Sequence, residues 1–254
     1  MKLFFSRSGE EGQPILILHG LFGSGDNWHT HARELARTNR VYVVDQRNHG
    51  RSPHSPEMSY SSMVADLLDV IASEGLRDVI LVGHSMGGKT VMRFAQEHPF
   101  LVERMVVVDM GVRQYAPHHD RIFQGLFAVD VDHVPSRKEA ESRLAPFVDD
   151  PATVQFLMKN VYWVEEGKLA WRFNLPVLFE RIADILEEVP LAPKIEVPAL
   201  FLKGEKSGYI TLDEETRIRT ILPSAQFVTM KGSGHWPHAE VPELFLSALR
   251  HFIA

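Results

Sequence analysis

Cysteine is absent from this chain, and its absence removes several chemistries at once. Without thiols the chain can form no disulfide bond, offer no thiolate nucleophile and build no cysteine-ligated zinc site. The His-Glu-x-x-His helix of metal-dependent hydrolases is missing as well. We therefore expect no bound metal, and the lack of cysteine fits a reducing compartment.

Long apolar runs and excess positive charge are also lacking. The apolar runs are no longer than a strand, so we expect no membrane span. The N-terminal sequence MKLFFSRSGEEG lacks the apolar stretch of a signal peptide. The 254 residues carry 33 acidic and 27 basic side chains, and the formal net charge of −6 disfavours a nucleic-acid partner. These features predict a cytoplasmic protein, a monomer or small homo-oligomer, that binds a small molecule.

The chain does contain a regular alternation of short β-branched runs and amphipathic stretches. This alternation is typical of an α/β protein with a mostly parallel sheet and helices on both faces. Several runs are apolar without alternation, as expected for strands that are covered on both sides. The strand candidates are residues 15–20, 41–45, 79–85, 105–109, 199–204 and 226–230, with an additional edge strand at 3–8.

Two segments between these strands show helical features. Residues 60–76 open with serines, place apolar side chains along one helical face, and the helix is expected to stop at Gly75. Residues 87–99 form a second predicted helix, which Pro99 ends. In the first helix the apolar face consists of Met63, Leu67, Val70 and Ile71.

The strand pattern breaks between residues 112 and 190. This segment has helical stretches separated by the aromatic sequence VYWVEEGKLAWRF, and the strand pattern resumes after it. Such an insertion late in the chain is most simply a helical cap over the C-terminal edge of the sheet. We therefore predict a core of residues 1–111 and 191–254, with a cap of residues 112–190.

The sequence LVGHSMGGKT at 81–90 contains the pattern Gly-x-Ser-x-Gly, centred on Ser85. A strand candidate precedes it and a helix follows it, which is the context of a nucleophile elbow. Gly83 and Gly87 leave room for a tight turn that a Cβ would crowd, and the helix N-terminus directs free N–H groups toward charge forming beside the serine. We predict that Ser85 is a nucleophile, with a serine that only caps a helix as the alternative.

A serine hydroxyl needs a base to remove its proton. Among the 13 histidines, His235 follows the last strand candidate in KGSGHWPHAE, a loop expected at the same sheet edge as Ser85. His238 is the alternative base, although its place at the start of the next element favours a capping role. Structural hydrogen bonding is expected of three histidines that neighbour glycines near this edge, His19, His49 and His84.

The acid that orients the histidine must lie at the same edge. Asp109 ends the strand candidate 105–109, one strand beyond that of Ser85, and we predict that it is this acid. Glu205 and Asp213 follow the strand candidate 199–204 and are the alternatives. An aspartate that only caps the next helix is the alternative role for Asp109.

Two backbone amides are expected to form an oxyanion hole. One is that of Met86, the residue after the nucleophile. The other comes from the loop HGLFGSGDNW, where a turn at His19-Gly20 leaves the amide of Leu21, or as an alternative that of Phe22, free to point inward.

Three stretches, DQRNHGRSPHSPEMSY, GHSMGGKT and GHWPHAE, together resemble the α/β-hydrolase superfamily, and more narrowly its YbfF-type esterases and their mitochondrial animal relatives. The resemblance spans nearly the whole chain and implies an α/β-hydrolase fold with serine, histidine and acid on Ser85, His235 and Asp109. Many members carry an aspartate where this chain has Ser207, a departure that the YbfF-type esterases share. Some animal relatives have been assigned an acid within the cap, where this chain has Pro176.

The resemblance also implies hydrolysis of carboxylic esters and acyl-thioesters through an acyl-enzyme, without a cofactor. Aromatic side chains of the cap and of the loops at the sheet edge are expected to line an acyl pocket, or else to form the core of the cap. Arg47, Lys89 and Arg113 are candidates to contact an anionic leaving group such as coenzyme A. The candidate substrate contacts are Phe22, Phe123, Phe127, Trp163 and Trp236, with Trp171 and Phe179 as further candidates.

Two other functions use the same residues. In a lyase or C–C hydrolase, the Ser-His pair acts as a base and activated esters give no acyl-enzyme burst. In a small-molecule receptor on this fold, a ligand stabilises the protein but turnover is negligible.

Overall fold

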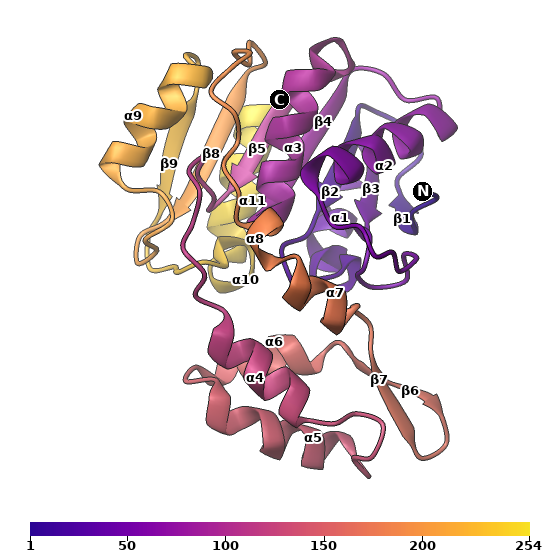
Figure 1. Ribbon diagram of the computed structural model, residues 1–254. Coiled ribbons are helices and arrows are strands. Elements are labelled where there is room, and N and C mark those ends of the chain that lie inside the picture. Colours follow the sequence, from indigo (N-terminus) through magenta and orange to yellow (C-terminus); the bar gives the residue numbers. More distant parts are fainter.

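A seven-stranded sheet forms the centre of the computed structural model, which describes residues 1–254. The strands lie in the order β1-β3-β2-β4-β5-β8-β9 (Figure 1), and only β1 runs antiparallel to its neighbour, β3. The prediction of a mostly parallel sheet is confirmed. The strands are β1 Phe5–Ser8, β2 Pro14–Leu18, β3 Arg40–Val44, β4 Val79–His84, β5 Val102–Val108, β8 Ala199–Gly204 and β9 Gln226–Met230.

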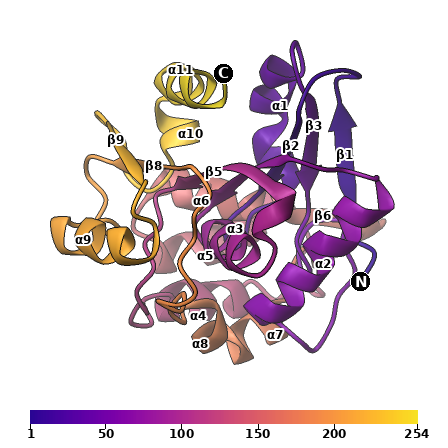
Figure 2. The same cartoon turned by 90° about the horizontal axis from the view of Figure 1, so that it is seen from above.

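Helices cover both faces of this sheet (Figure 2). On one face, α1 (His29–Leu35) and α11 (Pro242–Ile253) pack through Leu35, Phe245 and Leu249, together with Trp28 just before α1, against strand residues such as Ile17. Helices α2 (Tyr60–Ser73), α3 (Met86–Glu97) and α9 (Leu212–Ile221) cover the other face. Strand β2 is apolar and buried along its whole length because it is covered from both sides.

The helix boundaries follow local chemistry. Ser59 caps α2 by accepting a hydrogen bond from the Ser62 amide, and Gly75 follows the helix with a φ of +61°, which favours glycine. Helix α3 ends at Glu97, two residues before Pro99. The four apolar residues predicted to share a face of α2 are all buried.

Residues 112–190, called the inserted segment below, separate β5 from β8. Most of the segment lies beyond one end of the sheet (Figure 1), whereas Val112, Tyr115, Leu186 and Val189 at its two ends pack in the core of the sheet region. The aromatic stretch at its centre, expected as a link between helices, forms the antiparallel hairpin β6-β7. Gly167 lies in the turn between β6 and β7, and its φ of +80° is a conformation that favours glycine. The elements are α4 Asp120–Ala128, α5 Arg137–Leu144, α6 Pro151–Met158, β6 Val161–Glu165, β7 Lys168–Trp171, α7 Leu175–Glu180 and α8 Ile182–Ile185.

No helix in the structure combines the length and the apolar character needed to cross a lipid bilayer.

Candidate active site

Ser85 lies at the junction of β4 and α3, in a backbone conformation that side chains rarely adopt. Its φ is +52° and its ψ is −117°. The neighbouring glycines are required because a Cβ on Gly83 would lie 2.2 Å from the carbonyl oxygen of Gly87, and one on Gly87 would lie 2.5 Å from that of Leu18. The Ser85 amide donates to the carbonyl of Val108 on β5, at 3.1 Å. The turn therefore presents the serine at the C-terminal edge of the sheet.

Asp109 follows β5, the next strand, and is fully buried. Its Oδ1 accepts a hydrogen bond of 2.9 Å from the Gly204 amide at the end of β8. Its Oδ2 accepts from Nδ1 of His235 at 2.8 Å and also from the hydroxyl of Ser207. Donors from three sides thus hold this carboxylate in one orientation.

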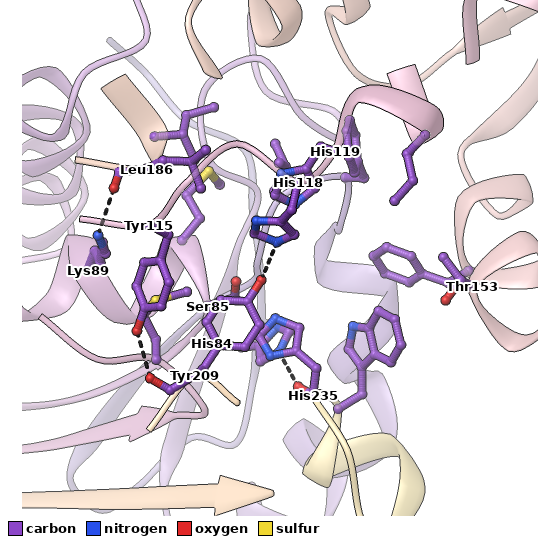
Figure 3. A pocket seen from close by; sticks show the side chains of 18 of the residues that line it. His84, Ser85, Lys89, Tyr115, His118, His119, Thr153, Leu186, Tyr209 and His235 are labelled. Atoms are coloured by element: carbon purple, nitrogen blue, oxygen red, sulfur yellow. Dashed lines mark hydrogen bonds between the residues drawn. The ribbon is translucent and has the colours of Figure 1, made fainter. Parts of the chain in front are cut away.

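His235 lies in the loop between β9 and α10 (Pro237–Glu240). An ionised carboxylate only accepts hydrogen bonds, so Nδ1 of His235 carries the proton that it shares with Asp109. Nε2 of the neutral ring is then free to act as a base. His84 Nε2 donates to the His235 carbonyl at 2.8 Å and so ties this loop to the end of β4 (Figure 3).

Ser85, His84 and His235 line one cavity, and no hydrogen bond joins Ser85 Oγ to His235. Serine–histidine hydrogen bonds of this kind are often long in ligand-free enzymes and shorten when substrate binds. The structure thus brings together the three residues that the sequence analysis singled out for a triad, from the ends of three strands. A hydroxyl, an imidazole and a carboxylate in this order can support nucleophilic attack on an acyl carbon.

His238, the alternative base, lies elsewhere. It is buried and stacks on Trp28 with ring centroids 4.2 Å apart, and it does not border the cavity that contains Ser85. Burial lowers the pKa of His238 to about 3. His19 and His49 are likewise buried and bonded to backbone groups.

The alternative acids contact no histidine. Glu205 accepts a hydrogen bond from the Gly232 amide at 2.8 Å, and Asp213 is exposed in the first turn of α9. Ser207, at the position where an aspartate would be expected, donates to Asp109 instead. Of the three candidate acids, only Asp109 is positioned to orient His235.

Two amides are available beside Ser85. The Leu21 amide has no acceptor within the protein, and Met86 is the first residue of α3, where no intrahelical acceptor is available. The Phe22 amide, in contrast, donates to His49 Nε2 at 3.2 Å. A Cβ added at Gly20 would lie only 3.1 Å from the Cβ of Ser85. The backbone just before Leu21 therefore runs next to the serine.

The cavity in front of Ser85 has a volume of about 250 Å³, and 12 of its 19 lining residues are hydrophobic. One wall comes from the sheet edge and the other from the inserted segment. Such a mostly apolar space with few polar groups suits an acyl chain. The hydrophobic wall of the inserted segment includes Ile122, Phe156, Leu157, Ile185 and Leu186.

Of the aromatic residues expected to contact substrate, some line the cavity and others lie away from it. Phe22 and Trp236 line the cavity. Phe123 is buried beside it and packs edge-on against Phe22 at 5.4 Å. Phe127 and Trp163 do not border the cavity, and each is 46% exposed. Their side chains point out of the inserted segment because α4 and the β6-β7 hairpin turn other residues toward its core. Trp171 and Phe179 lie outside the cavity as well.

The three basic residues considered for an anionic leaving group are engaged within the protein. Arg47 is buried and makes two hydrogen bonds to Asp66, of 2.7 and 3.0 Å. Lys89 is buried, and its ammonium group donates to the carbonyls of Arg113, Leu186 and Glu187. Burial lowers the pKa of Lys89 to about 7. Arg113 is 3.8 Å from Glu214 and is the most exposed of the three, but only Lys89 borders the cavity that contains Ser85.

Several cavity residues were not anticipated from the sequence. Tyr209 lies two residues after Ser207 in the loop after β8. Its position at the edge of the sheet is the feature of the sequence that could have identified it. His118, His119, Thr153 and Phe156 come from the inserted segment, where no sequence pattern shows which helical face meets the sheet. No cluster of three or more histidine, aspartate or glutamate side chains could hold a metal ion.

Comparison with known proteins gives a consistent set of similarities. The family model described as "alpha/beta hydrolase fold" matches residues 13–242. The chain is 38% identical to the mouse sn-1-specific diacylglycerol lipase ABHD11, over 94% of this chain and 80% of that protein. It is 33% identical to esterase YbfF of Escherichia coli (strain K12), over 98% and 96% of the two chains.

A solved structure described as a marine microorganism esterase superposes with a TM-score of 0.96. It is 42% identical in sequence, and the match covers 99% of each chain.

Proposed function

Because the chain belongs to the α/β-hydrolase family, and its similar relatives are named esterases and lipases, we propose that it is a serine hydrolase of carboxylic esters. The observation that carries the proposal is the bond of 2.8 Å between His235 and Asp109, beside a serine on a strained strand–helix turn. In this proposal Ser85 is the nucleophile, His235 the general base and Asp109 the acid that orients it.

The reaction proceeds through an acyl-enzyme. Ser85 Oγ attacks the ester carbonyl while His235 Nε2 takes its proton, and the amides of Leu21 and Met86 donate to the resulting oxyanion. The imidazolium, stabilised by Asp109, then protonates the leaving alcohol. A water molecule, deprotonated by His235, releases the acid and regenerates Ser85.

The inserted segment acts as a cap that supplies the acyl-binding wall. Its apolar residues at the cavity favour an ester whose acyl part is a hydrocarbon chain. Acyl-thioesters are a second proposed substrate class, because the same attack on the carbonyl applies and the thiol leaves readily.

The test is hydrolysis of p-nitrophenyl esters from acetate to palmitate by the wild type and by Ser85→Ala. We expect turnover that depends on chain length in the wild type, and a loss of about a thousandfold or more in the variant. A parallel series of acyl-coenzyme A substrates, followed by thiol release, tests the thioester class. Equal and negligible turnover by both proteins would contradict the proposal and favour a lyase or a receptor.

A further inference from the structure

One hydrogen bond does not fix the plane of the His235 ring. The bond to Asp109 holds Nδ1, but the terminal torsion of histidine is broad, so the ring can turn about this contact and move Nε2. Proton transfer requires Nε2 to point at Ser85 Oγ. Some other group must therefore determine the plane of the ring.

Tyr209 covers a face of this ring. The two rings are stacked, with centroids 4.2 Å apart and planes inclined by 20°. His84 and Trp236 also contact His235, but at 45° and 58°, so neither supplies a parallel surface. Tyr209 is thus the aromatic neighbour whose plane matches that of the imidazole.

Tyr209 is itself held at both ends (Figure 3). His118 Nδ1 lies 2.9 Å from the Ala116 carbonyl and donates to it, so Nε2 of the neutral His118 ring is an acceptor. The Tyr209 hydroxyl donates to that Nε2 at 2.7 Å. The Tyr209 carbonyl accepts from the hydroxyl of Tyr115 at 2.9 Å.

The backbone next to the ring is tied to the same network. The Tyr209 amide donates to the Ser207 hydroxyl at 3.2 Å, and that hydroxyl donates to Asp109. The Tyr115 hydroxyl also accepts from the Gly111 amide at 2.9 Å. The ring of Tyr209 is therefore a fixed surface, although it belongs to a loop.

We propose that Tyr209 is a positioning residue that holds the His235 imidazole in the plane needed for proton transfer from Ser85. The inference rests on the proposed role of His235 as base. It assigns the function to the aromatic ring, because the hydroxyl faces away toward His118. Without the hydroxyl, the Tyr209 backbone keeps its bonds to Tyr115 and Ser207, so the stack should survive removal of the hydroxyl but not removal of the ring.

The test compares Tyr209→Phe with Tyr209→Leu. Two rates are measured for each, kcat with a p-nitrophenyl ester and the rate at which a fluorophosphonate labels Ser85, which needs no knowledge of the substrate. We expect Tyr209→Leu to lose about 10- to 100-fold in both rates with KM changed by less than threefold, since a misplaced catalytic group costs about this much. Tyr209→Phe should stay within threefold of the wild type.

Two controls separate positioning from folding. The urea midpoints of both variants are measured, and Tyr162→Leu removes a tyrosine from the β6-β7 hairpin, outside the cavity. Equal rates for Tyr209→Leu and the wild type would overturn the inference while leaving the proposed function intact. A loss in Tyr209→Phe as large as in Tyr209→Leu would also overturn it, because the hydroxyl would then be the essential part. An inert wild type would refute both proposals together.

Discussion

The sheet and the inserted segment contribute to the candidate site in different ways. The sheet supplies the three proposed catalytic residues, since Ser85, Asp109 and His235 each follow a strand. The inserted segment supplies mainly apolar wall, with Ile122 and Phe156 among its residues. Strand register fixes the reactive groups through the backbone, whereas side-chain packing fixes the wall. The difference suggests that changes at the sheet edge should alter kcat, and changes in the inserted segment should alter substrate choice.

A small number of polar contacts join the two regions. Lys89 on α3 donates to carbonyls on both chain segments that connect them. The Tyr60 hydroxyl donates to the Ile185 carbonyl at 2.7 Å, and the Asn160 side-chain amide donates to the backbone carbonyl of Phe22 at 2.8 Å. The following changes test whether chemistry and selectivity separate along this boundary.

Asp109→Asn should have the largest effect. The amide cannot stabilise the imidazolium, and it removes the charge that holds the His235 proton on Nδ1. We therefore expect kcat for ester hydrolysis to fall about 10⁴-fold with little change in KM. Asp213→Asn is the matched control and should leave kcat unchanged. An Asp109→Asn enzyme with more than a tenth of wild-type kcat would place the acid elsewhere.

Acid should destabilise the sheet region through its buried histidines. Burial lowers the pKa of His19 to about 4 and that of His49 and His238 to about 3, from an ordinary value of 6.5. As the pH falls from 6.5 toward 4, the unfolded chain takes up protons that the folded chain does not. The free energy of unfolding therefore falls, by up to about 1.4 kcal/mol per pH unit for each histidine.

Urea denaturation at pH 7 and pH 5 measures this dependence. His238→Phe, which can keep the stack on Trp28, should make it shallower. His133→Gln, at an exposed histidine of the inserted segment, should not flatten it. A wild type equally stable at both pH values would show that these histidines titrate alike in the folded and unfolded chains.

Lys89→Met should loosen the connection between the two regions. Three carbonyls lose their donor, and a buried acceptor left without a partner costs about 1–3 kcal/mol. We expect faster hydrogen exchange in residues 112–118 and 182–190, with slower exchange retained in β4 and β5. Lys203→Met, which breaks a pair between β8 and Glu215 of α9, serves as the control. Unchanged exchange in both connecting segments would contradict the role given to Lys89.

Ile122→Trp should have the smallest effect and should act on selectivity. The larger side chain fills part of the cavity, so the preferred p-nitrophenyl ester should become shorter and KM for long-chain esters should rise by a few-fold to about tenfold. Phe127→Trp places the same side chain outside the cavity and should leave the chain-length profile unchanged. The reverse pattern would mean that the acyl chain follows the exposed side of α4.

The sequence was most informative where backbone chemistry decides the structure. The α/β-hydrolase resemblance and the mostly parallel sheet are confirmed, and β8 and β9 coincide with their predicted ranges. Gly83 and Gly87 indicated the turn at Ser85 because only glycine fits there. Asp109 was predicted beside His235 because parallel strands end at a common edge, with Glu205 and Asp213 as alternatives, and the bond to His235 distinguishes Asp109 from them.

Side-chain packing in the inserted segment was not accessible in the same way. Phe127 and Trp163 have the size and polarity of pocket residues, yet both face outward. Phe156 is also a large aromatic residue of the inserted segment, but it lines the cavity. Which aromatic residue faces the sheet depends on how α4, α6 and the hairpin pack together, and no local pattern encodes that arrangement. Arg47 also looked available for a ligand, because the sequence does not show that Asp66 of α2, 19 residues further along the chain, pairs with it.

The strands that flank the inserted segment are direct neighbours in the sheet. Because β5 and β8 are parallel, the chain leaves β5 at one end of the sheet and enters β8 at the other. The two ends of the inserted segment nevertheless meet, since the Val189 amide donates to the Val112 carbonyl at 2.7 Å. A segment whose two ends meet can change in length or be exchanged without shifting the strand register. The inserted segment could therefore be replaced by the corresponding segment of a related hydrolase to change substrate choice, provided that the new segment offers backbone carbonyls to the Lys89 ammonium group.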